Sequence, residues 1–374
     1  MANTLALGCV VALAIWATTA AYRIWLHPLS RYPGSKTAAV SNSWWELYWN
    51  YYRNGEMIFE IERLHKVHGP VIRIGVNDIH ISDPRVFYDI TQVKSTFTKS
   101  ADFYQHISFP KTLIGESDVA WHRTRRRVLA PALTGSRLQG LAEDVMLKSR
   151  HLMARFEEAA AKSSPVCINA AMKAFTMDII SPIVLGQDFE CVLDDQFHNQ
   201  FSEHLRAAFS VGWISTAFPL TSAFALKVAS YTSVSIFPLP LLTFKRKCLG
   251  ITKKYIENAA NQANDGQTNS KKSPVIDLLM DAGAVDGHVV PALSELNDEL
   301  IMLLIAGNDT TSHSLIFGIY QISTNPTVQR RLVEELVREF PTLEEDVTYV
   351  RAKKLEFLVS KNRSFSWKTK LSLK

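Results

Sequence analysis

The chain has 374 residues, of which 47% are hydrophobic and 21% charged, so it is long enough for one large domain and is neither disordered nor collagen-like. Its formal net charge of +5 is small for this length, which argues against a dedicated nucleic-acid-binding protein. The four cysteines match no zinc or Cys-x-x-Cys spacing and indicate a reducing compartment rather than a disulfide framework.

The beginning of the chain, residues 1–25, predicts a membrane anchor. Ala2 to Tyr22 contains no charged residue, and as a helix this run would span about 31 Å, close to the ~30 Å hydrocarbon core of a bilayer. A cleaved signal peptide is the alternative, but no basic region precedes the run and the apolar stretch is long. Because Arg23, Arg31 and Lys36 follow it, the positive-inside rule places the rest of the chain in the cytosol.

The body of the chain, residues 26–358, predicts one domain that is mainly α-helical with a small β region. An apolar stripe over 56–67 predicts a helix, and the β-rich runs 71–74 and 79–81 predict a hairpin. Asp83 followed by Pro84 predicts the start of another helix. Longer helices are expected at 138–162, 171–185, 200–209, 249–264 and 294–323, with a linker at 264–273 and with Ser294 and Asn297 capping the last helix.

The segment from Ala207 to Phe244 carries one charged residue, Lys227. Its first part could form a second spanning helix, but its prolines and its many serines and threonines make it a poor one. We therefore expect a hydrophobic loop pair that dips into the membrane surface or covers an apolar pocket.

Trp121 and Arg125 form the first candidate site, within an arginine-rich helix at 121–131. Residues four apart share a helix face, and an indole N–H beside a guanidinium makes a donor pair suited to a carboxylate. A solvated basic face is the other interpretation, and we adopt it for Arg123 and Arg127. Such a patch can also dock an acidic protein partner.

The second candidate site is the run Ala306-Gly307-Asn308-Asp309-Thr310-Thr311 in the helix expected at 294–323. Its small residues leave room for a flat ligand against the backbone, and the Thr310 hydroxyl is expected to bond to the carbonyl of Ala306. An acid beside a hydroxyl can relay protons. From these residues alone, close helix packing through small side chains is the stronger interpretation.

Taken together, these segments resemble the cytochrome P450 family of haem-thiolate monooxygenases, in particular its fungal membrane-anchored members. The resemblance covers roughly residues 26–358. It rests on His27-Pro28-Leu29, Tyr32-Pro33-Gly34, His68-Gly69-Pro70, the Trp-x-x-x-Arg of Trp121 and Arg125, and the Ala-Gly-x-Asp-Thr-Thr run. It implies the cytochrome P450 fold, a haem b cofactor, electrons from NADPH through NADPH–cytochrome P450 reductase, and a single-pass anchor on the cytosolic face of the endoplasmic reticulum membrane.

The resemblance also implies roles for individual residues. Trp121 and Arg125, joined by His122, would hold a haem propionate, and Ala306 and Gly307 would lie against the haem. Asp309 and Thr310 would deliver the protons that split bound dioxygen. The implied reaction hydroxylates or epoxidises a lipophilic secondary-metabolite intermediate of terpenoid or polyketide type. A non-catalytic membrane-anchored remnant or binding protein is the alternative.

The sequence departs from the family after the second candidate site. The family's Glu-x-x-Arg and Phe-x-x-Gly-x-x-x-Cys-x-Gly motifs do not occur, and no cysteine follows Cys248. Because the thiolate favours O–O cleavage, we expect an inactive P450 domain that lacks its haem-ligand part.

Residues 359–374 differ in composition from the rest of the chain. They hold five basic residues and no acid, whereas the rest of the chain has 36 of each. The codons for Val359-Ser360 can form a splice-donor sequence, so we interpret this stretch as an aberrant basic tail from a translated intron or a frameshift.

Overall fold

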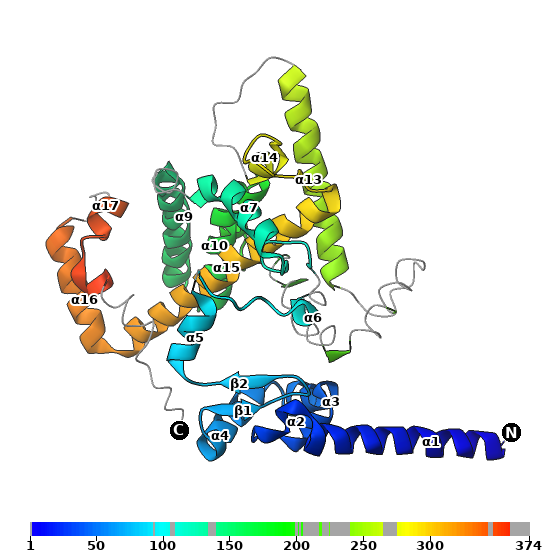
Figure 1. Cartoon of the computed structure of the whole chain (residues 1–374). Helices are drawn as coiled ribbons and strands as arrows, with labels where there is room; N and C mark the ends of the chain where they lie inside the picture. The colour runs from blue at the N-terminus through cyan, green and yellow to red at the C-terminus, as the bar shows by residue number, and fades with distance from the viewer. Residues whose placement is uncertain are drawn as a thin grey trace. The chain divides into compact units, whose positions relative to one another are not determined.

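The computed structural model describes residues 2–92, 94–104, 109–133, 140–198, 201, 203–204, 217–218, 224, 240–264, 275–342 and 347–359. These residues are mainly α-helical, with one two-stranded sheet among them (Figure 1). The fold class predicted from the sequence is therefore confirmed. The chain divides into two compact units, Met1–Pro110 with Ala208–Pro238, and Lys111–Ala207 with Leu239–Lys374.

The first unit begins with the predicted apolar helix. Helix α1 (Ala2–Ala21) continues into the wider π-helical turn η1 (Tyr22–Leu26), and the backbone becomes extended at His27, before the short 3-10 helix η2 (Pro28–Arg31). None of the residues in the window Ala6–Leu26 is buried, which is compatible with a membrane anchor. Ile168–Leu185 and Leu293–Thr324 are also long and apolar enough to span a bilayer, but they are 50% and 39% buried.

The rest of the first unit combines short helices with the predicted hairpin. Its elements are α2 (Lys36–Val40), α3 (Asn42–Leu47), the π-helical turn η3 (Tyr48–Tyr52), α4 (Met57–His68), β1 (Val71–Arg73), β2 (Ile79–Ile81), α5 (Pro84–Thr91) and α6 (Ala101–Tyr104). Strands β1 and β2 pair antiparallel, with Val71 opposite Ile81. As predicted, Asp83 caps α5, because its carboxylate accepts the N–H of Arg85 at 2.9 Å. The helices between residues 36 and 52 were not predicted.

Two arginines fix the end of α1 to the body of the first unit. The guanidinium of Arg23 donates to the carbonyl of Val40 at 2.6 Å, and that of the buried Arg73 donates to the carbonyl of Arg23 at 2.8 Å. Arg73 also donates to the carbonyls of Gly75 and Val76. The exit of the apolar helix is therefore bonded to α2 and to the hairpin.

The second unit is built around two long helices. Its elements are α7 (Val119–Leu129), η4 (Ala130–Leu133), α9 (Ala142–Ala161), α10 (Ile168–Leu185), η5 (Cys191–Leu193), α13 (Pro240–Asn264), α14 (Val275–Met280), α15 (Leu293–Thr324), α16 (Pro326–Glu339) and α17 (Tyr349–Ala352). Helix α15 packs along α10 (Figure 1), and the core between these helices and their neighbours includes the fully buried side chains of Met177, Val184, Leu296, Leu300 and Leu304.

The predicted long helices are confirmed at α9, α10, α13 and α15, although α13 begins earlier than expected. The predicted cap of α15 is wrong. The helix begins after Ala292, whose side chain cannot accept a hydrogen bond, so Ser294 lies within the first turn. Asn297 lies further along and donates instead to the carbonyl of Lys245 at 3.1 Å.

Four expectations fall wholly or largely outside the described residues. They concern the helix at 200–209, the loop pair at Ala207–Phe244, the linker at 264–273 and the basic tail at 359–374. Each of them stays a prediction.

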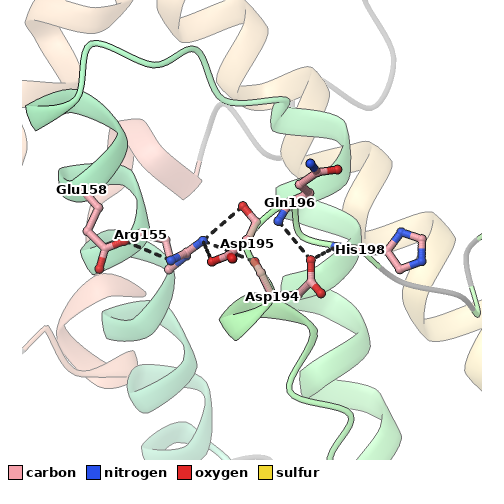
Figure 2. A network of polar contacts seen from close by, with 6 residues as sticks. All are labelled: Arg155, Glu158, Asp194, Asp195, Gln196 and His198. Carbon is pink, nitrogen blue, oxygen red and sulfur yellow. Dashed lines mark hydrogen bonds and ion pairs between the residues drawn. The ribbon is translucent and has the colours of Figure 1, made fainter.

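A polar network holds the loop after η5 against α9 (Figure 2). Arg155 of α9 pairs with Glu158 at 2.9 Å and donates to the carbonyl of Asp195 at 3.1 Å. The Asp194 carboxylate accepts the N–H groups of Gln196 and His198, and these bonds lower its pKa. The loop is thereby bonded to α9.

Candidate functional site

The Trp121–Arg125 pair lies on α7, which starts where the Asp118 carboxylate accepts the N–H groups of Ala120 and Trp121, at 2.7 and 3.1 Å. The guanidinium carbon of Arg125 lies 4.8 Å from the centroid of the Trp121 ring. The two side chains therefore share a helix face, as predicted, and form a cation–π contact.

Arg125 is buried, and one of its donors is unsatisfied. Its residue is 5% exposed, and its Nη1 atom is buried without a hydrogen-bond partner in the part of the chain that the structure describes. Burial lowers the pKa of Arg125, while the carboxylates of Glu299 and Glu295 act in the opposite direction. A buried donor without a partner costs about 1–3 kcal/mol, so an anionic acceptor placed at Nη1 would be strongly favoured.

A cavity of about 240 Å³ opens beside this pair. Its walls are Ala120, Trp121, Thr124 and Arg125 of α7 and Gly287, His288 and Val289 of the loop before α15. His288 is held in place by a 3.0 Å contact between its Nε2 atom and the carbonyl of Leu279. The third residue predicted to join the pair, His122, is half-buried on α7 and does not line this cavity.

Two acids at the start of α15 support the site, and the sequence analysis missed both. The carboxylate of the fully buried Glu299 accepts the N–H of Leu113 with both oxygens, at 3.0 and 3.1 Å, and Glu295 pairs with Lys111 at 2.8 Å. Burial raises the pKa of Glu299, against the effects of the Leu113 N–H and of Arg125. The i, i+4 spacing of two acids beside an apolar stripe was the available signal.

The second candidate site lies further along α15. The Thr310 hydroxyl donates to the carbonyl of Ala306 at 2.7 Å, which confirms the predicted bond, and the helix continues through this point without a break. Asp309 lies next to it, but its carboxylate is 3.3 Å from the Nζ atom of Lys173 on α10. The acid and the hydroxyl are therefore neighbours that bond to different partners.

Close packing explains part of the small-residue run. A Cβ atom on Gly307 would lie 2.7 Å from Cγ1 of Ile180, which is closer than side-chain carbons approach one another. Beside it, the Thr176 hydroxyl donates to the buried side chain of Asn308 at 2.6 Å. Gly307 and Asn308 therefore hold α15 against α10, whereas Thr310 is exposed on another side of the helix.

The two candidate sites lie in the same unit, and α15 connects them. Glu299, beside Arg125, and Thr310 are about 16 Å apart along the helix at ~1.5 Å per residue. The first site offers a buried guanidinium beside a cavity, with one N–H group that has no partner among the described residues, and the second offers an exposed hydroxyl beside an acid. The described residues therefore suit a ligand that carries a carboxylate and needs a proton donor elsewhere.

Two of the four cysteines are unfavourable candidates for a thiolate that binds iron. Cys191 and Cys248 are buried, and burial raises the pKa of both thiols, that of Cys248 to about 12, which disfavours the thiolate. Cys9 and Cys167 are exposed. Across the described ranges, no three His, Cys, Asp or Glu side chains gather in a metal-binding group. Arg125 and Trp121 therefore fit the carboxylate end of a haem, whereas the buried Cys191 and Cys248 are poorly suited to supply its thiolate.

Comparison with known proteins identifies the family. The cytochrome P450 family model matches residues 40–360. Cytochrome P450 monooxygenase sol6 of Alternaria solani is 48% identical over 361 residues, which are 95% of this chain and 76% of sol6. Cytochrome P450 monooxygenase aneF of Aspergillus aculeatus is 27% identical over 352 residues, 92% of this chain and 70% of aneF.

A solved structure supports the fold. The crystal structure of the cytochrome P450 CYP102L1 matches with a TM-score of 0.56 at 15% identity, over 81% of this chain and 67% of that one. At this identity the likeness concerns the fold alone. With the family-model match and the 48% identical relative, it leads to one conclusion: the chain belongs to the cytochrome P450 family.

Proposed function

We propose that the protein takes part in haem-dependent monooxygenation of a lipophilic molecule, hydroxylating or epoxidising an intermediate of fungal secondary metabolism of terpenoid or polyketide type. The names of its fungal relatives, cytochrome P450 monooxygenases, support the reaction class. The observation that carries the proposal is Arg125, which lines the cavity with Trp121 and whose buried Nη1 atom has no hydrogen-bond partner among the described residues. Haem b, when bound, supplies the iron that activates oxygen, with electrons from NADPH through NADPH–cytochrome P450 reductase.

We assign Arg125 and Trp121 to one haem propionate. His122 does not line the cavity beside them, and its contact with a propionate rests on the family resemblance alone. A propionate at Nη1 would satisfy the buried donor through a charge-assisted hydrogen bond, and the Trp121 ring restricts where the guanidinium can point. Glu299 acts indirectly, because it bonds the backbone at Leu113 and contributes negative charge near Arg125.

We assign proton delivery to Thr310 and Asp309. Thr310 is exposed, so its hydroxyl can turn from the Ala306 carbonyl and donate to a ligand on the open side of α15. Once the Asp309 carboxylate is released from Lys173, it would accept a proton from solvent and pass it to the Thr310 oxygen. We assign Ala306, which has a small side chain, to the haem side of this part of α15. Gly307 packs against Ile180 of α10, so we do not assign it a contact with the haem.

We propose that α1 anchors the protein by a single pass in the endoplasmic reticulum membrane, with the rest of the chain in the cytosol. The unburied apolar helix and the basic residues after it support this arrangement. Carbonate extraction of membranes tests it, since an anchored chain stays with the membrane pellet. Release into the soluble fraction would contradict the anchor.

The main alternative function depends on whether the chain supplies the cysteine thiolate that binds the haem iron. Residues 1–374 contain no cysteine after Cys248, so we propose that they do not supply this ligand by themselves and that they are inactive as they stand. A non-catalytic membrane-anchored remnant or binding protein is the second candidate.

A carbon-monoxide difference spectrum of the purified chain, loaded with haem and reduced, separates these possibilities. Our account predicts a haem absorbance without a thiolate-type Soret band. A thiolate-type band would refute the account of the missing ligand, and no haem absorbance at all would favour the binding protein.

A further inference from the structure

Two histidines of the first unit bond directly to each other. His65 lies on α4 and His80 is the middle residue of β2, and Nε2 of His65 lies 2.7 Å from Nδ1 of His80. Their ring centroids are 4.9 Å apart. Helix α4 packs against β1, the strand that pairs with β2, so this bond joins the helix to the hairpin (Figure 1).

A backbone carbonyl decides which nitrogen of each ring carries a hydrogen. Nδ1 of His65 lies 2.8 Å from the carbonyl oxygen of Gly69, which can only accept, so this nitrogen must donate. In the neutral ring, Nε2 of His65 is then the acceptor, and Nδ1 of His80 donates to it. The two rings therefore form a chain of N–H donors that ends at the Gly69 carbonyl.

This pair can take up one proton but not two. A first proton makes His65 an imidazolium, whose two N–H groups donate to the Gly69 carbonyl and to Nδ1 of His80, while the hydrogen of His80 moves to its Nε2 atom by exchange with solvent. A second proton would have to occupy Nδ1 of His80. It would set two N–H groups against each other across 2.7 Å and place two positive charges on neighbouring rings. Because neither ring could then accept, the bond between α4 and β2 would be lost.

The charged residues of α4 near the pair are matched in sign. Glu62 pairs with Lys66 at 2.6 Å, and Glu60 pairs with Arg63 at 2.7 Å. His68, which shares the last turn of α4 with His65, is exposed to solvent. The helix therefore presents no excess of negative charge that would stabilise a second proton on the pair.

The charged residues of the hairpin are engaged elsewhere. The guanidinium of Arg73 donates to backbone carbonyls, and the carboxylate of Asp78 accepts from the side chain of Asn42 at 2.8 Å. Burial lowers the pKa of His80 from its ordinary value of 6.5, and the charge of His65 lowers it further. Both causes oppose the doubly protonated pair.

We propose that the His65–His80 pair is an acid-sensitive latch, which holds the hairpin against α4 while the two rings share at most one proton and releases it when both rings are protonated. Below pH 6.5 the released His80 binds a proton that the latched one does not. The stability of the docked hairpin is therefore full above 6.5 and is lost as pH falls from 6.5 through the lowered pKa of His80. Since Arg73 of the same hairpin bonds to the carbonyl of Arg23, release would also loosen the exit of the apolar helix. The proposal does not rest on haem binding or on monooxygenation.

Hydrogen–deuterium exchange of the full chain in detergent, measured peptide by peptide between about pH 7.5 and about pH 5.5, tests the latch. Each rate is corrected for the intrinsic effect of pH on amide exchange. We expect the protection of residues 71–81 to fall by about three- to tenfold per pH unit below 6.5, since a difference of one proton gives at most a factor of ten. Helix α10 is the internal reference, and its protection should not fall. An equal loss in α10, or no loss in the hairpin, would overturn the latch.

Substitution separates the bond from its titration. In His80→Asn the side-chain amide can donate to Nε2 of His65, and it can turn and accept through Oδ1 when His65 is protonated, but it does not itself take up a proton. His68→Gln, which removes an exposed histidine from the same helix, is the matched control. We expect acid to loosen the hairpin in the wild type and in His68→Gln but not in His80→Asn. The same loss of protection in all three proteins would overturn the proposal.

A measurement on the wild-type chain decides the matter if His80→Asn fails to dock its hairpin at any pH. The hydrogen on the ring carbon between the two nitrogens exchanges at a rate that depends on the protonation of each histidine, so mass spectrometry gives a separate titration midpoint for each. We expect the midpoint of His80 in the full chain to lie below that of the same residue in a synthetic peptide of residues 76–84. Equal midpoints in the chain and in the peptide would overturn the latch.

Discussion

Lys173 of α10 and Asp309 of α15 form an ion pair in which Nζ lies 3.3 Å from Oδ1. The two side chains are 19% and 29% exposed, so water screens the pair less than it screens one on the open surface. The pair contributes to the α10–α15 contact and also occupies the carboxylate that we assign to proton delivery. The same interaction therefore bears on stability and on the availability of Asp309.

A double-mutant cycle measures this pair. We expect Lys173→Met and Asp309→Asn each to lower the free energy of unfolding in detergent, and the double variant to show a coupling of about 1 kcal/mol. Lys253→Met, at an exposed position of α13, is the matched control and should change stability little. Additive effects of the two substitutions would show that the pair contributes nothing.

Gly307 and Gly318 on α15 should respond in opposite directions to alanine. Gly→Ala in a helix interior normally stabilises by about 1 kcal/mol, and at Gly318 the new Cβ would meet nothing within 4 Å. At Gly307 it would lie 2.7 Å from Ile180, and overpacking costs about 1–3 kcal/mol. Urea unfolding should show Gly318→Ala more stable than the wild type and Gly307→Ala less stable.

The packing account of Gly307 has its own control. Combining Gly307→Ala with Ile180→Val removes a carbon atom from the crowded side chain and should recover part of the lost stability. If Gly307→Ala were as stabilising as Gly318→Ala, the close α10–α15 contact at this point would be refuted.

The contributions of Glu299 and Glu295 to the free energy of unfolding should depend on pH in opposite directions. The folded-state pKa of Glu299 is raised above the unfolded value of 4.5, mainly by burial, so its contribution to stability is full below 4.5 and is lost as pH rises from there through the folded value. That of Glu295 is lowered by its hydrogen bond to Lys111, so its contribution is present above 4.5 and is lost as pH falls.

Unfolding midpoints measured across this pH range test both signs. Glu299→Gln should reduce the loss of stability toward neutral pH, and Glu295→Gln should reduce the loss toward acid. Burial also raises the pKa values of Asp178 and Asp298. Part of the loss of stability toward neutral pH should therefore remain in the Glu299→Gln variant. A Glu299→Gln variant with the wild-type slope would contradict the burial of a charged carboxylate there.

Thr310→Val should separate proton delivery from folding. Valine keeps the branched shape but removes the hydroxyl, and because Thr310 is exposed the stability should change by no more than about 0.5 kcal/mol. In a form of the protein that carries the thiolate ligand, with the reductase, we expect less product per oxygen consumed. Thr311→Val, at the next exposed position, is the control, and equal coupling in both variants would refute the role of Thr310.

The local pattern of the sequence predicts much of the fold. The apolar run of α1, the Asp83–Pro84 start of α5 and the hairpin at β1 and β2 depend on neighbouring residues, so they can be read from the sequence. The short helices between 36 and 52 have no long apolar stripe, and burial of Trp45 against the rest of the unit helps to define them. Ser294 was predicted as the N-cap, which would start α15 at Glu295, but the helix starts at Leu293.

The candidate site was predicted only where its contacts lie within one helix. The shared face of Trp121 and Arg125 and the bond from Thr310 to Ala306 follow from helix spacing. The Lys173–Asp309 pair and the bond from Leu113 to Glu299 join residues more than a hundred positions apart, and only the packing of α10, α15 and the segment before α7 brings them together.

Haem titration of Arg125→Gln tests the central claim most directly, with Arg126→Gln, an exposed arginine on the same helix, as the matched control. Circular dichroism first confirms that both variants are folded, and the Soret absorbance then gives the dissociation constant. A charge-assisted hydrogen bond of about 1.5–3 kcal/mol predicts that Arg125→Gln binds haem roughly ten- to a hundredfold more weakly than the wild type, with Arg126→Gln unchanged. Equal affinity in the wild type and in both variants would contradict the assignment of Arg125 to a haem propionate.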